Sequence, residues 1–210
     1  RSIKNIGNLA TFQRFLRLCA ARSGHLLNYS ELGNACGITH NTARSWISVL
    51  QASYIVFMVQ PYHRNFNKRL VKTPKLYFHD TGLLCHLLNL RDPDTLRLSP
   101  FRGPVFESFV MSEIARHFLN RGDRPPVYFW RDKTGNEIDA IVDSPGAAIP
   151  VEIKSGATVL PDFFNGLNHW KRVSGSNARG YVIYGGDDSQ KRSDIDVLPL
   201  RELEALFGRI

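Results

Sequence analysis

The sequence predicts the α/β fold class (α+β over the whole chain). It places a winged helix-turn-helix in the first half of the chain and a mixed-sheet domain in the second half. Three observations lead to this fold class. Two short helices joined by a glycine turn precede a pair of strands. Short apolar strands then alternate with helices, and a proline-containing segment without periodicity separates the halves. We therefore expect a winged-helix domain over residues 1–90, a linker over 91–104 and a mixed-sheet domain over 105–210.

The first half opens with an amphipathic helix over residues 8–22, and the helix-turn-helix follows it. Ser30 is expected to cap the first of its two helices, which ends near Gly37, and Thr39 is expected to cap the second. Residues 54–60 and 74–78 then predict two returning strands. Together with the loop between them, these strands would form the wing.

Polar side chains on the second helix and in the wing loop predict contacts with nucleic acid. Arginine and asparagine make bidentate contacts with base edges, and basic side chains contact phosphate. The predicted nucleic-acid-binding residues are His40, Asn41 and Arg44 on the helix and Arg64, Lys68 and Arg69 in the loop. The same fold also serves to dock proteins, so both uses stay open.

A short helix starting at the capping residue Asp80 ends the first half, and residues 90–104 contain three prolines and mark the boundary. Residues 104–119 repeat apolar side chains at helical spacing and predict a core helix. Glu107 lies at the edge of its apolar stripe, in the first turn, where a carboxylate complements the helix dipole.

The stretch over residues 127–156 predicts three short strands joined by two turns. Because side chains alternate along a strand, Glu137 and Asp139 share one face of the second strand. Glu152 and Lys154 share one face of the third. Buried carboxylates need a cation or hydrogen bonds, so this charge indicates either an exposed sheet face with an ordinary Glu–Lys pair or a functional site. A helix over 161–173, strands over 179–184 and 195–198, and a final helix over 200–207 complete the domain.

The order of these acidic residues resembles that of the PD-(D/E)XK nuclease-like superfamily. A helix with Glu107 precedes a hairpin with Asp139, and Glu152-Ile153-Lys154 follows; Ile138 stands where the superfamily name has a proline. With the first half included, the chain resembles the C-terminal portion of bacterial and archaeal AAA-type ATPases that carry a nuclease-like domain of unknown function. The segments that carry this resemblance are KLYFHDTGLL at 75–84, FESFVMSEIAR at 106–116 and VEIKSG at 151–156.

This resemblance implies a metal-dependent nuclease, a hydrolase of phosphodiesters. Asp139 and Glu152 would hold Mg²⁺ or Mn²⁺, and Glu107 would be a further ligand, directly or through water. Lys154 would orient the attacking water or stabilise the charge that develops on phosphate. Glu137 is an alternative ligand on the same strand face. ATP would bind only in the full-length protein, and the expected partners are nucleic acid, in the first place DNA, and the protein's own upstream ATPase domain.

Composition agrees with a polyanionic partner, since the 210 residues carry a formal net charge of +8. Three widely spaced cysteines without a Cys-x-x-Cys or histidine cluster predict reduced thiols in a cytoplasmic protein. No apolar run approaches the ~20 residues that span a bilayer, so no membrane partner is expected. The chain starts at Arg1 and lacks Gly-x-x-x-x-Gly-Lys-Ser/Thr, so we expect a fragment without the nucleotide-binding part.

Two other functions remain open beside the nuclease. The chain could serve as a non-catalytic regulatory module that docks DNA or a protein while the ATPase does the work. It could also be a sequence-specific transcription regulator, which would discriminate bases by about 1–3 kcal/mol for each mismatched pair.

Overall fold

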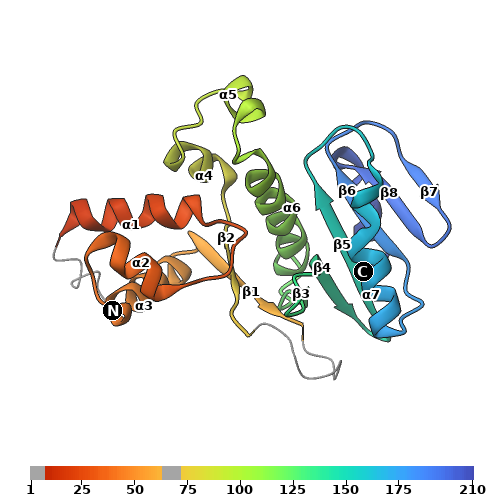
Figure 1. The fold of residues 1–210 in the computed structure, drawn as a ribbon, viewed down its shortest axis with the longest axis horizontal. Helices are drawn as coiled ribbons and strands as arrows, with labels where there is room; N and C mark the ends of the chain where they lie inside the picture. The colour runs from red at the N-terminus through yellow and green to blue at the C-terminus, as the bar shows by residue number, and fades with distance from the viewer. Residues whose placement is uncertain (1–7, 63–71) are drawn as a thin grey trace. The chain divides into compact units, whose positions relative to one another are not determined.

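The computed structural model describes residues 8–62 and 72–210, and the protein is α+β (Figure 1). Within these described residues, eight strands form a mixed sheet in the order β2-β1-β3-β4-β5-β6-β8-β7. The chain divides into two compact units. Unit 1 comprises residues 1–58 and 73–109, and unit 2 comprises residues 59–72 and 110–210.

Unit 1 begins with three helices that pack around one apolar core. They are α1 (Leu9–Ala21), α2 (Tyr29–Cys36) and α3 (His40–Ala52). Thr39 caps α3 as predicted, because its side chain accepts the Thr42 N–H. The predicted cap of α2 was wrong: Asn28 accepts the Glu31 N–H at 3.1 Å, and Ser30 is already the second helical residue.

Two strands follow the three helices: β1 (Val56–Pro61) and β2 (Lys75–Phe78). β1 starts later than predicted because Tyr54 has φ +54° and belongs to the end of α3. The predicted contact residues Arg64, Lys68 and Arg69 lie outside the described residues.

The segment predicted as a linker contains a helix. After α4 (Thr81–Leu87), α5 (Pro93–Leu98) begins where Asp92 accepts the Thr95 N–H at 2.8 Å, and α6 (Arg102–Leu119) follows. Proline is the first residue of α5, where its missing N–H costs nothing. None of the α5 residues is buried, so this helix has no apolar periodicity for the sequence to reveal.

Unit 2 is built on antiparallel and parallel strands in one sheet. The strands are β3 (Val127–Arg131), β4 (Glu137–Ser144), β5 (Ala147–Lys154), β6 (Gly180–Tyr184), β7 (Gln190–Arg192) and β8 (Ile195–Pro199). β3, β4 and β5 pair antiparallel, whereas β5 pairs with β6 and β6 with β8 in parallel. The short strand β7, which was not predicted, pairs antiparallel with β8.

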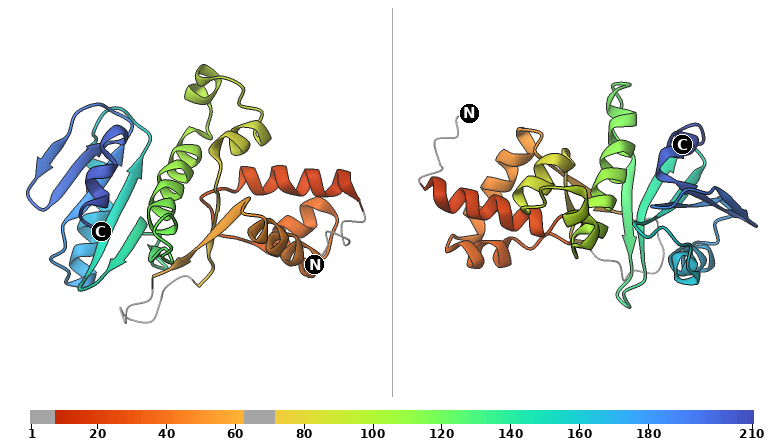
Figure 2. Two further views of the ribbon diagram at one scale, coloured as in Figure 1. Left: turned by 180° about the vertical axis from the view of Figure 1, so that it is seen from behind. Right: turned by 90° about the horizontal axis from the view of Figure 1, so that it is seen from above.

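Helices complete unit 2. The 3₁₀ helix η1 (Pro161–Phe164) leads into α7 (Asn165–Ser174), which lies against β4 and β5 (Figure 2). The 3₁₀ helix η2 (Leu200–Glu202) and α8 (Glu204–Phe207) stand where a single final helix was predicted. Leu167 and Trp170 of α7 are buried with Trp130 and Val182 in the core that this helix covers. Over the described residues, no helix combines the length and apolar character needed to cross a membrane.

Candidate functional site

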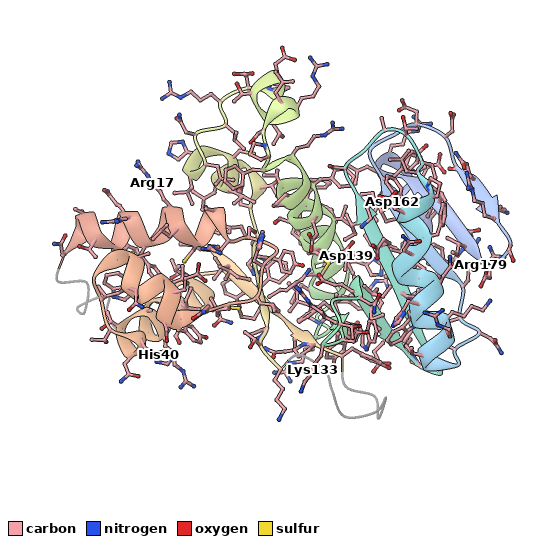
Figure 3. The ribbon with its side chains drawn as sticks, viewed as in Figure 1. Arg17, His40, Lys133, Asp139, Asp162 and Arg179 are labelled. Carbon is pink, nitrogen blue, oxygen red and sulfur yellow. The ribbon has the colours of Figure 1, made fainter. Side chains whose placement is uncertain are left out.

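Asp139 is held at the point where the β4–β5 pairing changes. The paired residues run from Ser144 and Ala147 to Ala140 and Val151. One residue further along β4, the Asp139 side chain takes part in the pairing of the two strands, because its Oδ2 accepts the Ile153 N–H at 2.8 Å. A carboxylate therefore replaces a main-chain acceptor, which fixes the Asp139 side chain against β5 (labelled in Figure 3).

Lys154 joins the two carboxylates that the sequence predicted to lie on one face. Its Nζ donates to Glu152 Oε1 at 2.7 Å and lies 3.8 Å from Asp139 Oδ2. The Glu152 residue is only 6% exposed, so its carboxylate has little access to water. Asp139, Glu152 and Lys154 thus form one compact cluster, and one formal positive charge faces two carboxyl groups.

The second oxygen of Glu152 has no protein partner. Oε2 is buried and makes no hydrogen bond within the described part of the chain. The first turn of α7 packs beside it: a Cβ on Gly166 would stand 3.1 Å from this oxygen and 2.6 Å from the Glu137 carbonyl oxygen. Only glycine lets the helix approach this closely, and the helix in turn helps to exclude water from Glu152.

Burial in the first place and the nearby Asp139 carboxylate in the second raise the pKa of the Glu152 carboxyl to about 8, against the opposing effect of Lys154. Two carboxyl groups with one lysine in a water-poor site cannot both ionise without further compensation. The raised pKa favours the protonated form of Glu152, and a bound cation would favour its ionised form.

A second ion pair borders the cluster on the same sheet. Arg131 of β3 is paired in register with Glu137 of β4, and their side chains lie 3.1 Å apart. The negative charge of Glu137 adds, as the smallest of the causes, to the raised pKa of Glu152. Arg131 was not among the predicted site residues, and no sequence pattern marked it, because the strand register decides which residue of β3 faces Glu137.

The residues present fit a hard divalent cation. Mg²⁺ is often bound through one or two carboxylates, with water and phosphate filling the other positions. The buried, unpartnered Oε2 of Glu152 beside Asp139 is the kind of acceptor that such an ion would complete. Among residues 8–62 and 72–210, no group of three or more His, Cys, Asp or Glu side chains is placed to share one ion, so the other ligand positions would fall to water, main-chain carbonyl groups or phosphate.

Glu107 belongs to unit 1, where it takes part in a different polar cluster. Its Oε1 accepts hydrogen bonds from Tyr77 Oη at 2.5 Å and Lys75 Nζ at 3.1 Å. Lys75 is 3% exposed and therefore buried, whereas the Glu107 side chain is 18% exposed. Gly24, with φ +79°, stands beside the Glu107 carboxylate, and its Cβ would come within 3.3 Å of Oε2.

The described residues of the predicted nucleic-acid interface lie on α3. His40, Asn41 and Arg44 are exposed there, and His40 is labelled in Figure 3. The His40 ring also packs edge-on against Tyr29, with ring centres 5.5 Å apart. These side chains are available for contact with a partner.

Comparison with known proteins gives matches over both halves of the chain. Residues 1–94 match a domain of unknown function (DUF8612), and residues 102–203 match another domain of unknown function (DUF4143), which is commonly found in AAA-ATPase proteins. Uncharacterized proteins of Mycobacterium bovis and Mycobacterium tuberculosis are each 32% identical to the chain over 185 residues. The alignment covers 88% of this chain, which spans about 40% of the length of these curated relatives.

Proposed function

We propose that the chain is the C-terminal part of an AAA-type ATPase and that unit 2 carries a divalent-metal-dependent site for phosphodiester hydrolysis. The observation that carries this proposal is the Asp139–Glu152–Lys154 cluster with its buried, unpartnered carboxylate oxygen. The match of residues 102–203 to a domain common in AAA-ATPase proteins supports the ATPase context. The arrangement of the first half supports a winged helix that binds nucleic acid.

In this proposal Asp139 and Glu152 hold Mg²⁺ or Mn²⁺, which when bound lowers the pKa of water and draws charge from phosphate. Lys154 would turn from the carboxylates toward the phosphate, where its ammonium would stabilise negative charge that develops during attack. The Ile153 N–H keeps the Asp139 carboxylate oriented. Gly166 lets α7 cover Glu152, which limits the access of water.

Glu107 receives no part in the proposed chemistry. Its Oε1 is engaged by Tyr77 and Lys75 within unit 1. We infer that this carboxylate stabilises the packing of α6 on β2, because removing it would leave the buried Lys75 charge without its anionic partner.

Titration calorimetry with Mn²⁺ tests the proposal. The chain is expected to bind Mn²⁺, and Glu152→Gln and Asp139→Asn are expected to weaken binding at least about tenfold, since each removes one anionic ligand. Asp143→Asn, an exposed residue of the same strand β4, is the matched control and should bind as the parent does. Parent protein that binds no Mn²⁺, alone or with an oligonucleotide present, would contradict the metal site.

Cleavage is measured next, with end-labelled DNA and RNA oligonucleotides and Mn²⁺. We expect cleavage by the parent and by Asp143→Asn, and loss of cleavage by Glu152→Gln and by Lys154→Met. A Lys154→Met variant that still binds Mn²⁺ but does not cleave would separate the role of the lysine from metal binding.

One observation favours a second function, a non-catalytic module that docks nucleic acid or a protein. Lys154 already lies against both carboxylates, and the raised pKa of Glu152 leaves the cluster close to neutral without any metal. This function predicts nucleic-acid binding that Arg44→Ala weakens, with no metal-dependent cleavage under any condition tested.

A further inference from the structure

A row of aromatic rings in unit 1 runs from the core to the surface at the end of α3. Tyr77 is fully buried and stacks on Phe57, with ring centres 5.6 Å apart and planes at 25°. Phe57 lies 4.6 Å from His79, and His79 lies 6.1 Å from Tyr54. Tyr54 ends the row and is 75% exposed. A large aromatic side chain is therefore presented to solvent on a rigid base.

The backbone at Tyr54 is better suited to glycine. The Ile55 N–H bonds to the Leu50 carbonyl oxygen at 3.0 Å, and the Tyr54 N–H bonds to the Gln51 carbonyl oxygen at 3.1 Å. This is the Schellman ending of a helix, in which the residue at the position of Tyr54 adopts a left-handed conformation and is usually glycine. Tyr54 has φ +54°, a conformation that a bulky residue adopts at a cost.

Packing does not account for a tyrosine at this position. Its nearest ring is His79, at a tilt of 49°, and most of its surface faces solvent. A main-chain hydrogen bond holds the turn in place, because the His79 N–H donates to the Ile55 carbonyl oxygen at 3.1 Å. The side chain thus strains the backbone and gains little burial, which leaves its ring available for contact with a partner.

The surface that leads to Tyr54 is polar and carries positive charge. Arg44, Ser48 and Gln51 are exposed and follow one another at helical spacing along α3, and the ridge ends at Tyr54. Across the chain the formal net charge is +8. A cationic, hydrogen-bonding track that ends in an exposed ring fits a nucleic-acid strand, since phosphates follow the track and an unpaired base stacks on the ring.

We propose that Tyr54, supported by His79 and Phe57, is a stacking platform for an unpaired base of a single-stranded nucleic acid. The inference rests on the proposed function only in taking nucleic acid as the partner. It specifies the kind of nucleic acid as a strand with accessible bases rather than an uninterrupted duplex. Base stacking on an aromatic side chain depends little on sequence, so the platform would accept many strands.

Fluorescence anisotropy with the whole chain tests the platform, using a labelled single strand of about 12 nucleotides and a hairpin duplex in EDTA. Tyr54→Gly suits the backbone and keeps the fold, and Tyr54→Phe keeps the ring. We expect Tyr54→Gly to weaken single-strand binding about tenfold and duplex binding less than about twofold, and Tyr54→Phe to bind as the parent does.

Equal single-strand affinity of the parent and Tyr54→Gly would overturn the platform. Equal losses for single strand and duplex, or a parent that binds no single strand, would also overturn it. EDTA prevents metal-dependent cleavage, and Mn²⁺ binding is measured separately with Glu152→Gln. An anisotropy result that overturns the stacking platform therefore does not bear on the metal site. Absence of Mn²⁺ binding likewise does not affect the anisotropy measurement.

Discussion

The buried Glu152 carboxyl predicts a specific dependence of stability on pH. Its pKa is raised from the ordinary value of 4.5 to about 8, by burial first and by Asp139 second. Between these values the folded protein keeps a proton that the unfolded chain has released. Unfolding then releases a proton, so the free energy of unfolding falls as the pH rises from 4.5 to about 8.

Glu152→Gln removes this titration and keeps the size of the side chain. At about 1.4 kcal/mol for each pH unit, the interval from pH 4.5 to about 8 corresponds to a change of at most about 5 kcal/mol in the free energy of unfolding. The titration is shared with Asp139 and Lys154, and water can enter as the site ionises, so we expect about 2 kcal/mol. Relative to the parent, the variant should gain this stability between pH 5 and pH 9.

Urea unfolding in EDTA measures this difference at intervals across the same pH range. EDTA is needed because a bound divalent cation would favour the ionised carboxylate and hide the effect. Titrating groups outside the Asp139–Glu152–Lys154 cluster, including the seven histidines, are common to parent and variant and cancel in the difference. Asp143→Asn should follow the parent at every pH. A difference between parent and Glu152→Gln that stays constant within about 0.5 kcal/mol would refute the reasoning.

Three further predictions concern stability and are checked by chemical or thermal unfolding. Gly166→Ala should destabilise the protein by about 2 kcal/mol, because its Cβ would stand 2.6 Å from the Glu137 carbonyl oxygen. The control Gly208→Ala, where the Cβ meets open space, should leave the stability nearly unchanged. Equal losses of stability in the two variants would argue against the close approach of α7. Lys75→Met should cost about 2 kcal/mol because it leaves the half-buried Glu107 without its cation. Adding Glu107→Leu should restore most of the loss, and a double variant as unstable as the single one would contradict this account. Tyr54→Gly should stabilise the protein by about 1 kcal/mol, since glycine suits φ +54°, and a lower melting temperature would show that the ring has a packing role.

Local sequence patterns predicted most of the elements, because those patterns act over a few residues. Thr39 and Asp80 are the caps of α3 and α4, as predicted, and the apolar alternation located β4 and β5. The same reasoning missed α5, which buries no residue, and β7, a three-residue strand of Gln190, Lys191 and Arg192. Elements without an apolar face leave no periodic signal.

For the site, strand alternation predicted that Glu137 and Asp139 share one face of β4 and that Glu152 and Lys154 share one face of β5. The nuclease chemistry assigned to them stays a prediction. Alternation could not reveal that Asp139 accepts the Ile153 N–H, that Arg131 faces Glu137, or that Gly166 brings α7 against Glu152. These contacts join residues far apart in the chain or depend on strand register and helix approach.

The sequence by itself thus determined which residue types lie on which face of each element, since side-chain direction follows from local backbone geometry. Only the tertiary structure decided their electrostatic state. Glu152 is an ordinary carboxylate in the sequence, and it becomes a buried group with an unpartnered oxygen and a raised pKa once α7 covers it and Asp139 lies beside it. The free energy of a charge depends on the water and charges around it, and packing alone sets both.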